Sequence, residues 1–446
     1  MPKKYYISGA TLVNEGKSYK ADVLIQDGLI TAISENRLDI SEDVIIIDAS
    51  GKYLLPGVID DQVHFRDPGL TQKGDIYTES KAAVAGGVTS FMDMPNTIPN
   101  TLTQELLEEK YQAASEKALA NYSFYMGVSN NNLEEVLKTN PSRVCGIKVF
   151  LGASTGNMLV DNLETLENLF REAPALIAVH CEDEPIIKEN LAYFKQRFGD
   201  DIPVNVHHLI RSREACFKSS SFAINLAKKY NTRLHILHLS TADEMALLSD
   251  APSDENKRIT AEVCVHHLWF SKEDYDTKGV WIKWNPAIKE SFDRSALMKA
   301  LHDNRIDVIA TDHAPHTKDE KSKPYLNCPS GGPLVQHSLV AMLEKAKLGE
   351  IAIELVVEKM CHTPAKIFRV ERRGFIRTGY HADLVLVDPN LSWTVSKENI
   401  LYKCGWSPFE GVTFNSMITH TFVGGHLAYE NGTFDESVKG KRLMFS

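Results

Sequence analysis

Eight short apolar runs recur through the middle of the chain, at residues 57–65, 87–95, 122–129, 145–152, 176–183, 233–240, 259–267 and 307–316. The segments between them include stretches with helical periodicity, such as TQELLEEKYQAASEKALA at 103–120 and REACFKSSSFAINLAKKY at 213–230. Strands that alternate with helices eight times predict an α/β fold, a (β/α)8 barrel of the TIM type. In such a barrel the active site lies at the carboxyl ends of the strands.

The two ends of the chain have a different pattern. Short alternating runs broken by turn signals occupy 5–13, 21–28, 29–34 and 44–49, and they return at 381–388, 417–425 and 426–432. This pattern predicts a small composite β-domain built from both termini, residues 1–54 plus 367–446, beside a catalytic barrel of residues 55–366. The polar segment 317–333 is rich in Gly and Pro and predicts an active-site loop after the eighth strand.

Composition excludes several classes of partner. The net charge is −10 and no long run of like charge occurs, which argues against a nucleic-acid surface. No stretch approaches the ~20 apolar residues that span a bilayer, and the amino terminus lacks a signal-peptide core. The seven cysteines are scattered without a CxxC pair, so we expect buried, reduced thiols and a cytoplasmic protein.

Polar residues at the ends of the predicted strands point to metal chemistry. His64, His180 and His238 end strands one, five and six, and Asp312 ends strand eight. One such histidine alone is more commonly structural, but imidazoles and a carboxylate gathered at one end of a barrel suit zinc. Lys148, inside the apolar fourth run, is either a snorkelling or ion-paired side chain or a buried neutral amine. A neutral amine can take up carbon dioxide, and the resulting carbamate can bridge two cations.

Several motifs together carry a resemblance to a known family. HFRDPG (64–69), MDMPNT (92–97), GIKVFLG (146–152), AVHCED (178–183), HILHLST (235–241) and TDHAPHT (311–317) resemble a cyclic amidohydrolase, and most of all a dihydroorotase. The resemblance covers nearly the whole chain, including GYHADLVLVD at 379–388. It implies two zinc ions per chain and an N6-carboxylated Lys148. The implied metal ligands are His64, Lys148, His180, His238 and Asp312, and the implied substrate-binding residues are Arg66, Asn96, Asn285, His316, Ser330 and Gly331.

The resemblance implies reversible cyclisation of N-carbamoyl-L-aspartate to L-dihydroorotate in pyrimidine (UMP) biosynthesis. Attack by a metal-bridging hydroxide would be assisted by Asp312 as general base and acid. Arg66 favours this substrate because a guanidinium matches its carboxylate, which hydantoin and allantoin lack. Two alternatives stay open: a hydantoinase- or allantoinase-like enzyme, and a catalytically inert scaffold for aspartate transcarbamoylase. The sequence does not fix the oligomeric state, and a homodimer and an association with aspartate transcarbamoylase are both considered.

Gln62 departs from the family's usual His-x-His pair. Three interpretations compete: Gln62 ligates a metal through its amide oxygen, it lies behind a water that does so, or the first metal is absent. The neighbouring Asp61 is a poor substitute because alternate residues of a strand point to opposite faces. We expect the metal nearest strand one to be the weaker of the two.

Overall fold

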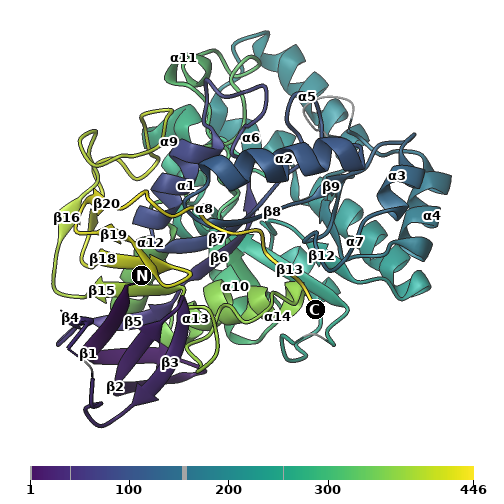
Figure 1. Cartoon of the computed structure of the whole chain (residues 1–446). Helices are drawn as coiled ribbons and strands as arrows, with labels where there is room; N and C mark the ends of the chain where they lie inside the picture. Colours follow the sequence, from purple (N-terminus) through teal and green to yellow (C-terminus); the bar gives the residue numbers. More distant parts are fainter. Residues whose placement is uncertain (1–2, 41, 153–157, 255) are drawn as a thin grey trace.

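The structure is a computed structural model that describes residues 3–40, 42–152, 158–254 and 256–446. Figure 1 shows two parts side by side, a barrel wrapped by helices and a layer of long strands from the two ends of the chain. The α/β fold class predicted from the sequence, a barrel with an added β-layer, is confirmed.

Parallel strands form the barrel, one from each predicted run. In order around the barrel they are β6 (Val58–Val63), β7 (Val88–Asp93), β8 with β9 (Asn121–Phe124, Met126–Gly127), β10 (Ile147–Phe150), β11 (Ile177–His180), β12 (Leu234–Ile236), β13 (Ile259–Cys264) and β14 (Val308–Ala310). The third strand is in two pieces that pair with different neighbours, β8 with β7 and β9 with β10. The circle closes where His64 N donates to His313 O at 2.7 Å, beside a parallel bridge from Val63 to His313.

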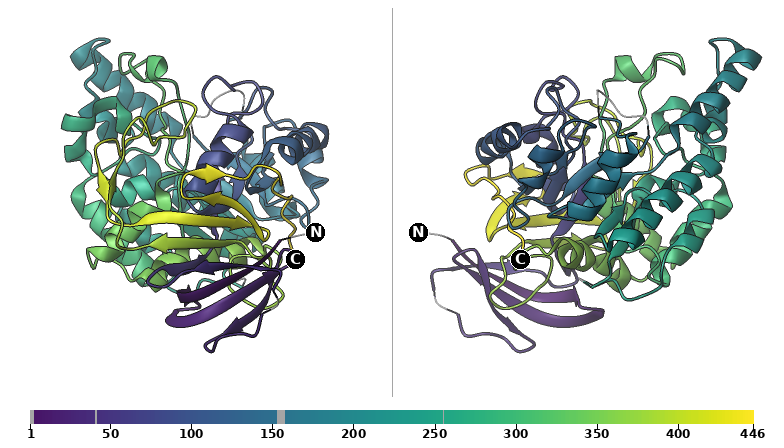
Figure 2. Two further views of the ribbon diagram at one scale, coloured as in Figure 1. Left: turned by 60° about the vertical axis from the view of Figure 1, so that its left-hand side comes forward. Right: turned by 90° about the vertical axis from the view of Figure 1, so that its right-hand side faces the viewer.

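Helices and helical turns lie outside these strands (Figure 2). Several begin where the sequence supplies a capping side chain, as at Asp75, Thr103 and Ser212, each of which accepts from a backbone N–H of the first turn. The α-helices are α1 (Ile76–Ala85), α2 (Gln104–Lys117), α3 (Leu133–Leu137), α4 (Leu163–Glu172), α5 (Glu184–Phe198), α6 (His207–Ile210), α7 (Arg213–Tyr230), α8 (Val265–Trp269), α9 (Tyr275–Lys278), α10 (Ser291–His302), α11 (Lys318–Lys321), α12 (Ser338–Lys347), α13 (Ile353–Val357) and α14 (Thr363–Phe368). The 3-10 turns are η1 (Val204–Val206), η2 (Asp243–Leu247), η3 (Lys272–Asp274) and η4 (Gly279–Ile282), and η5 (Glu358–His362) is a π-turn.

A nine-stranded sheet joins the two ends of the chain (Figures 1 and 2). The join is the antiparallel pair of β5 and β15, in which Pro56 lies opposite Leu384. The expected domain boundary after residue 54 therefore falls inside β5, and the division of the chain into two domains stays a prediction. The strands are β1 (Lys4–Asn14), β2 (Lys17–Gln26), β3 (Leu29–Ser34), β4 (Val44–Asp48), β5 (Tyr53–Pro56), β15 (Leu384–Asp388), β18 (Met417–Val423), β19 (His426–Glu430) and β20 (Thr433–Phe434), and β16 (Trp393–Thr394) pairs with β17 (Thr413–Phe414) beside them.

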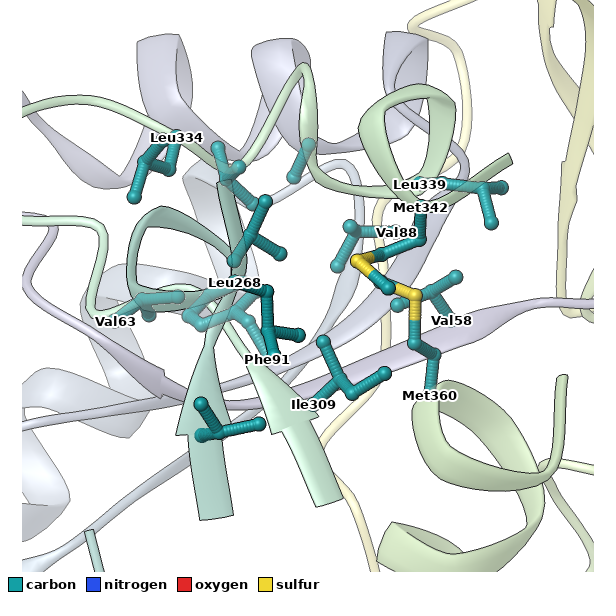
Figure 3. Packing of buried hydrophobic residues seen from close by; sticks show 14 of the residues in the cluster. Val58, Val63, Val88, Phe91, Leu268, Ile309, Leu334, Leu339, Met342 and Met360 are labelled. Atoms are coloured by element: carbon teal, nitrogen blue, oxygen red, sulfur yellow. The ribbon is translucent and has the colours of Figure 1, made fainter. Parts of the chain in front are cut away.

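The main hydrophobic core fills the space between the barrel strands and their helices. Figure 3 shows Val58 and Val88 of neighbouring strands packed near Met342 of α12 and Met360 of η5. All seven cysteines are buried and free, as the sequence predicts. Over the described residues, no helix combines the length and apolar character needed to cross a membrane.

Candidate active site

A cavity of about 270 Å³ opens among the carboxyl ends of the barrel strands and the loops that follow them. Its position is the one that the barrel fold predicts. All twelve residues singled out from the sequence line it: Gln62, His64, Arg66, Asn96, Lys148, His180, His238, Asn285, Asp312, His316, Ser330 and Gly331. Phe150, Trp284, Ala314 and Pro329 complete the lining.

The strands present these side chains at different depths. His180 is the last residue of β11, whereas Lys148 is the second residue of β10 and so lies inside its strand rather than at its end. Arg66, His238 and Asp312 follow their strands with φ of 68°, 41° and 49°, a left-handed region that few residues other than glycine adopt. Such backbone positions persist where the surrounding structure fixes them, and they concentrate at functional sites.

Two imidazoles converge on one point of the cavity. Nδ1 of His180 lies 2.9 Å from Nε2 of His238, and burial lowers the pKa of both rings, which keeps them neutral. The other nitrogen of His180, Nε2, lies 3.1 Å from the Glu182 carboxylate, which Arg211 also contacts. Burial alone would raise the pKa of Glu182, but Arg211 and His180 hold it at about 2. The charged carboxylate therefore orients His180 with Nδ1 toward the cavity.

His64 and Asp312 form the opposite wall. Nδ1 of His64 donates to Oδ1 of Asn96 at 2.7 Å, so its Nε2 faces Oδ1 of Asp312 at 3.1 Å. Gln62 points to the same carboxylate, with Nε2 3.2 Å from Oδ1 of Asp312. Nε2 of His64, Oδ1 of Asp312, Nδ1 of His180 and Nε2 of His238 are all atoms of the types that bind zinc.

The side-chain amine of Lys148 is buried. Its side chain is 1% exposed, and Nζ makes no hydrogen bond to any residue that the structure describes. Nζ lies 4.4 Å from the ring centroid of Phe150, and burial lowers the pKa of Lys148 to about 7. A substantial fraction of the amine is neutral near pH 7, as a carbamate-forming lysine requires.

Asp61 faces away from the cavity, as strand alternation predicts. Its Oδ2 lies 3.1 Å from Nε2 of His235, which is also 3.3 Å from the Glu262 carboxylate. Burial alone would lower the pKa of His235, but the two carboxylates raise it to about 9, so the ring carries a positive charge at neutral pH. The three residues could also surround a metal ion, as could Cys264, His266 and His267. A protonated His235 already offsets one negative charge of the first group, and burial with Asp61 raises the pKa of Glu262 well above its usual value.

The substrate-binding candidates line the same cavity. Arg66 is 5% exposed, and it donates through Nε to Pro315 O at 3.1 Å while Nη2 lies 3.1 Å from Nε2 of His316. The neighbouring Asp67 pairs with Lys117, whose Nζ lies 2.9 Å from Oδ2 of Asp67. Gly331 has φ of 121°, and a Cβ there would lie 2.7 Å from Ala314 O, so only glycine fits.

Sequence reasoning missed three residues that support this site. Glu182 and Arg211 hold His180, and Glu262 accepts from the backbone N–H of His238 at 3.0 Å, which fixes its left-handed turn. Glu182 could have been suspected from its place two residues after His180 in AVHCED. Nothing in the sequence pointed to Arg211, because its contact with Glu182 depends on how α6 packs.

The segment 317–333 borders the cavity through Pro329, Ser330 and Gly331, as expected of an active-site loop. It is not wholly irregular, since it contains α11. Thr317 begins this short helix with a capping box, in which Glu320 accepts from the Thr317 backbone N–H at 3.0 Å.

Comparisons with known proteins agree with this geometry. The model of the amidohydrolase family matches residues 53–428. The dihydroorotase of Methanosarcina acetivorans is 33% identical over 404 residues, 88% of this chain and 85% of that protein, and the dihydroorotase of Carboxydothermus hydrogenoformans is 33% identical over 94% of this chain and 96% of its own length.

Solved structures show the same fold. The L-hydantoinase (dihydropyrimidinase) from Arthrobacter aurescens has a TM-score of 0.91 and 28% identity over 98% of each chain. The dihydropyrimidinase from Brevibacillus agri NCHU1002 has a TM-score of 0.89 and 26% identity over 99% of each chain. The chain belongs to the amidohydrolase family and, within it, to the dihydroorotase group.

Proposed function

We propose that this chain is a dihydroorotase that interconverts N-carbamoyl-L-aspartate and L-dihydroorotate. One observation carries the proposal: a buried arginine, Arg66, lines the same cavity as Asp312 and the three histidines. A cyclic amide without a carboxylate gives a buried guanidinium no partner. L-Dihydroorotate carries that carboxylate, and the arginine fork can receive it through two parallel hydrogen bonds.

Neighbouring residues hold Arg66 in place for this contact. Nε of Arg66 donates to Pro315 O, and Nη2 of Arg66 lies 3.1 Å from Nε2 of His316. The same nitrogen of His316 lies 3.0 Å from Ser330 O. Burial lowers the pKa of Arg66 to about 10, which leaves it fully charged at neutral pH. Oδ1 of Asn285 is buried and makes no hydrogen bond with the residues that the structure describes, so the Asn285 amide is proposed to contact the ring.

The donor set fits zinc, proposed here as two ions per chain. Lys148 offers an orphaned buried amine whose carboxylation would supply two oxygens, and two imidazole nitrogens meet at 2.9 Å. The proposed ligands are His64, His180, His238, Asp312 and carboxylated Lys148, with Gln62 beside them. When bound, such ions polarise the amide carbonyl and activate a water.

Asp312 is proposed to move the proton. In ring opening its carboxylate accepts the proton of the attacking water and delivers it to the departing ring nitrogen, and in cyclisation it takes a proton from the carbamoyl nitrogen. His64 and Gln62 both contact Oδ1 of Asp312, which fixes the orientation of the carboxylate. Trp284 and Phe150 line the same cavity and restrict access of bulk water.

A hydantoinase-like activity is the second candidate, because the structures named above include a hydantoinase with a TM-score of 0.91. Purified, zinc-loaded protein should therefore be assayed with L-dihydroorotate, hydantoin and allantoin. We expect turnover of L-dihydroorotate to exceed that of the other two. Turnover of hydantoin without L-dihydroorotate would reverse the proposal, and no turnover of any of them by the metal-loaded protein would favour the inert scaffold.

The proposed setting is pyrimidine (UMP) biosynthesis in the cytoplasm, with small-molecule substrates and neither nucleic acid nor membrane as partner. A homodimer and an association with aspartate transcarbamoylase are both compatible with this role. Light scattering of the purified chain, alone and with aspartate transcarbamoylase, distinguishes a monomer, a dimer and a mixed complex.

A further inference from the structure

A second cavity, of about 490 Å³, lies at the opposite end of the barrel from the active site. Residues at the starts of three strands line it, Cys145 before β10, Leu176 before β11 and Arg233 before β12. Its volume falls in the range of small-molecule sites. The active-site candidates of these strands lie within them or at their other ends, and none of the active-site candidates lines this cavity.

Among the described residues, the charged side chains that line this cavity are arginines. Arg171, Arg233, Arg258 and Arg369 line it, and no Asp or Glu is among the described residues that do so. This is notable in a chain with a net charge of −10, where acidic residues outnumber basic ones. In contrast to Arg171, Arg258 and Arg369, some arginines of the chain are paired with carboxylates, for example Arg211 with Glu182 and Arg373 with Asp383.

Neutral oxygens hold two of these guanidinium groups. Nη1 of Arg171 donates to Oδ1 of Asn168 at 2.8 Å and Nη2 to the Tyr230 hydroxyl at 3.3 Å, and Nη2 of Arg258 donates to Asn231 O. Neither Arg171, Arg258 nor Arg369 lies within ion-pair distance of a carboxylate of the described residues. These contacts fix the direction of the two exposed groups, and the carboxylates of Glu167 and Glu172 act on Arg171 only from beyond ion-pair distance.

Arg369 adds an unused donor. It ends α14 in the left-handed region, with φ of 58°, and its backbone O accepts from Ser446 N at 3.0 Å. Nε of Arg369 is buried and makes no hydrogen bond with the described residues. A buried guanidinium nitrogen without an acceptor is costly unless a ligand supplies one.

We propose that this cavity binds a small phosphorylated anion through Arg171, Arg258 and Arg369. Arginine is the side chain best suited to phosphate, since its planar fork donates two parallel hydrogen bonds to phosphate oxygens. The phosphate of a nucleotide and inorganic pyrophosphate share this chemistry. The proposal concerns binding alone and does not depend on the reaction catalysed at the other end of the barrel.

Isothermal titration of the full chain with pyrophosphate, UMP and uridine tests the proposal. We expect pyrophosphate, UMP or both to bind and uridine not to bind. If UMP binds more tightly than pyrophosphate, the ligand is a nucleotide. If pyrophosphate binds more tightly, the cavity recognises the phosphate groups alone. In Arg258→Gln/Arg369→Gln the affinity should fall by about 10-fold or more, because charge-assisted hydrogen bonds are lost.

Two matched variants make the test decisive. Arg197→Gln removes one positive charge from the surface of α5, away from the cavity, and should leave binding unchanged; an equal loss there would show unspecific attraction and overturn the proposal. Arg66→Gln should also retain binding, and its loss there would place the anion in the active site instead. The proposal also fails if neither phosphorylated compound binds at about 10 mM, or if the double variant, with an unchanged melting temperature, binds as the parent does.

Discussion

The side-chain amide of Gln62 joins Asp312 to Cys264. Its Nε2 lies 3.2 Å from Oδ1 of Asp312, and its Oε1 accepts from Sγ of Cys264 at 3.7 Å. With the oxygen facing Cys264, this arrangement argues against the interpretation in which Gln62 ligates a metal through its amide oxygen. In relatives with a His-x-His pair, a histidine occupies the position of Gln62. In this chain Gln62 orients Asp312, the proposed proton carrier.

Gln62→His should strengthen binding of the metal nearest β6, because imidazole is a better zinc ligand than a neutral amide. The measurement is zinc retained per chain during titration with a chelator, read by elemental analysis. In the parent protein one zinc should leave first, and in the variant the two should leave together. Gln62→Asn is the control, because it keeps the amide and should retain the early loss. Equal chelator sensitivity of Gln62→His and the parent would contradict the expectation.

Arg66→Gln should weaken transition-state binding of L-dihydroorotate by ~2–5 kcal/mol, since the substrate carboxylate loses its charged partner in a buried site. The fall in kcat/KM measures it. Arg66→Lys keeps the charge without the fork and should recover only part of the loss. Unchanged kinetics with L-dihydroorotate in Arg66→Gln would remove the basis of the substrate assignment.

Lys148 should take up carbon dioxide in a pH-dependent way. Only the neutral amine reacts, and because burial lowers the pKa of Lys148 from 10.5 to about 7, the reactive fraction should rise as pH increases through 7. Metal-free protein, decarboxylated at low pH and returned to labelled bicarbonate, can be followed by ¹³C NMR for the carbamate signal. Lys148→Met is the control and should show no signal. A carbamate yield that rises only near pH 10 would show that burial does not lower the pKa.

The sequence predicts the barrel and the lining of its cavity well because both follow from local patterns. Apolar runs give the strands, and a parallel barrel must bring the strand ends together, so His64, His180, His238 and Asp312 meet although up to 248 residues separate them. The contacts that the sequence did not predict depend on how the elements pack. Arg211, for example, reaches Glu182 only through the placement of α6.

Glu182→Gln should lower zinc affinity or kcat by about 10–100-fold, because His180 loses the carboxylate that orients its ring. The substitution keeps the shape of the side chain and leaves Arg211 with a neutral partner. Metal affinity, measured by competition with a chromogenic chelator, reports on the orientation of His180 independently of turnover. Glu189→Gln, at an exposed position on α5, should change neither quantity. If Glu182→Gln kept the zinc affinity and kcat of the parent, the Glu182 carboxylate would not be needed to hold His180.

His235 should be an imidazolium throughout the physiological range. Asp61 and Glu262 raise its pKa from 6.5 to about 9, so its folded state binds a proton that the unfolded state has lost above 6.5. The stabilisation from this proton is therefore fully present below pH 6.5 and disappears as pH rises through about 9. NMR titration of the ¹⁵N-labelled imidazole of His235 measures the pKa directly. A titration of His235 below pH 7 would mean that the two carboxylates share a proton or bind a cation, and would reopen the buried group Asp61, His235 and Glu262 as a metal site.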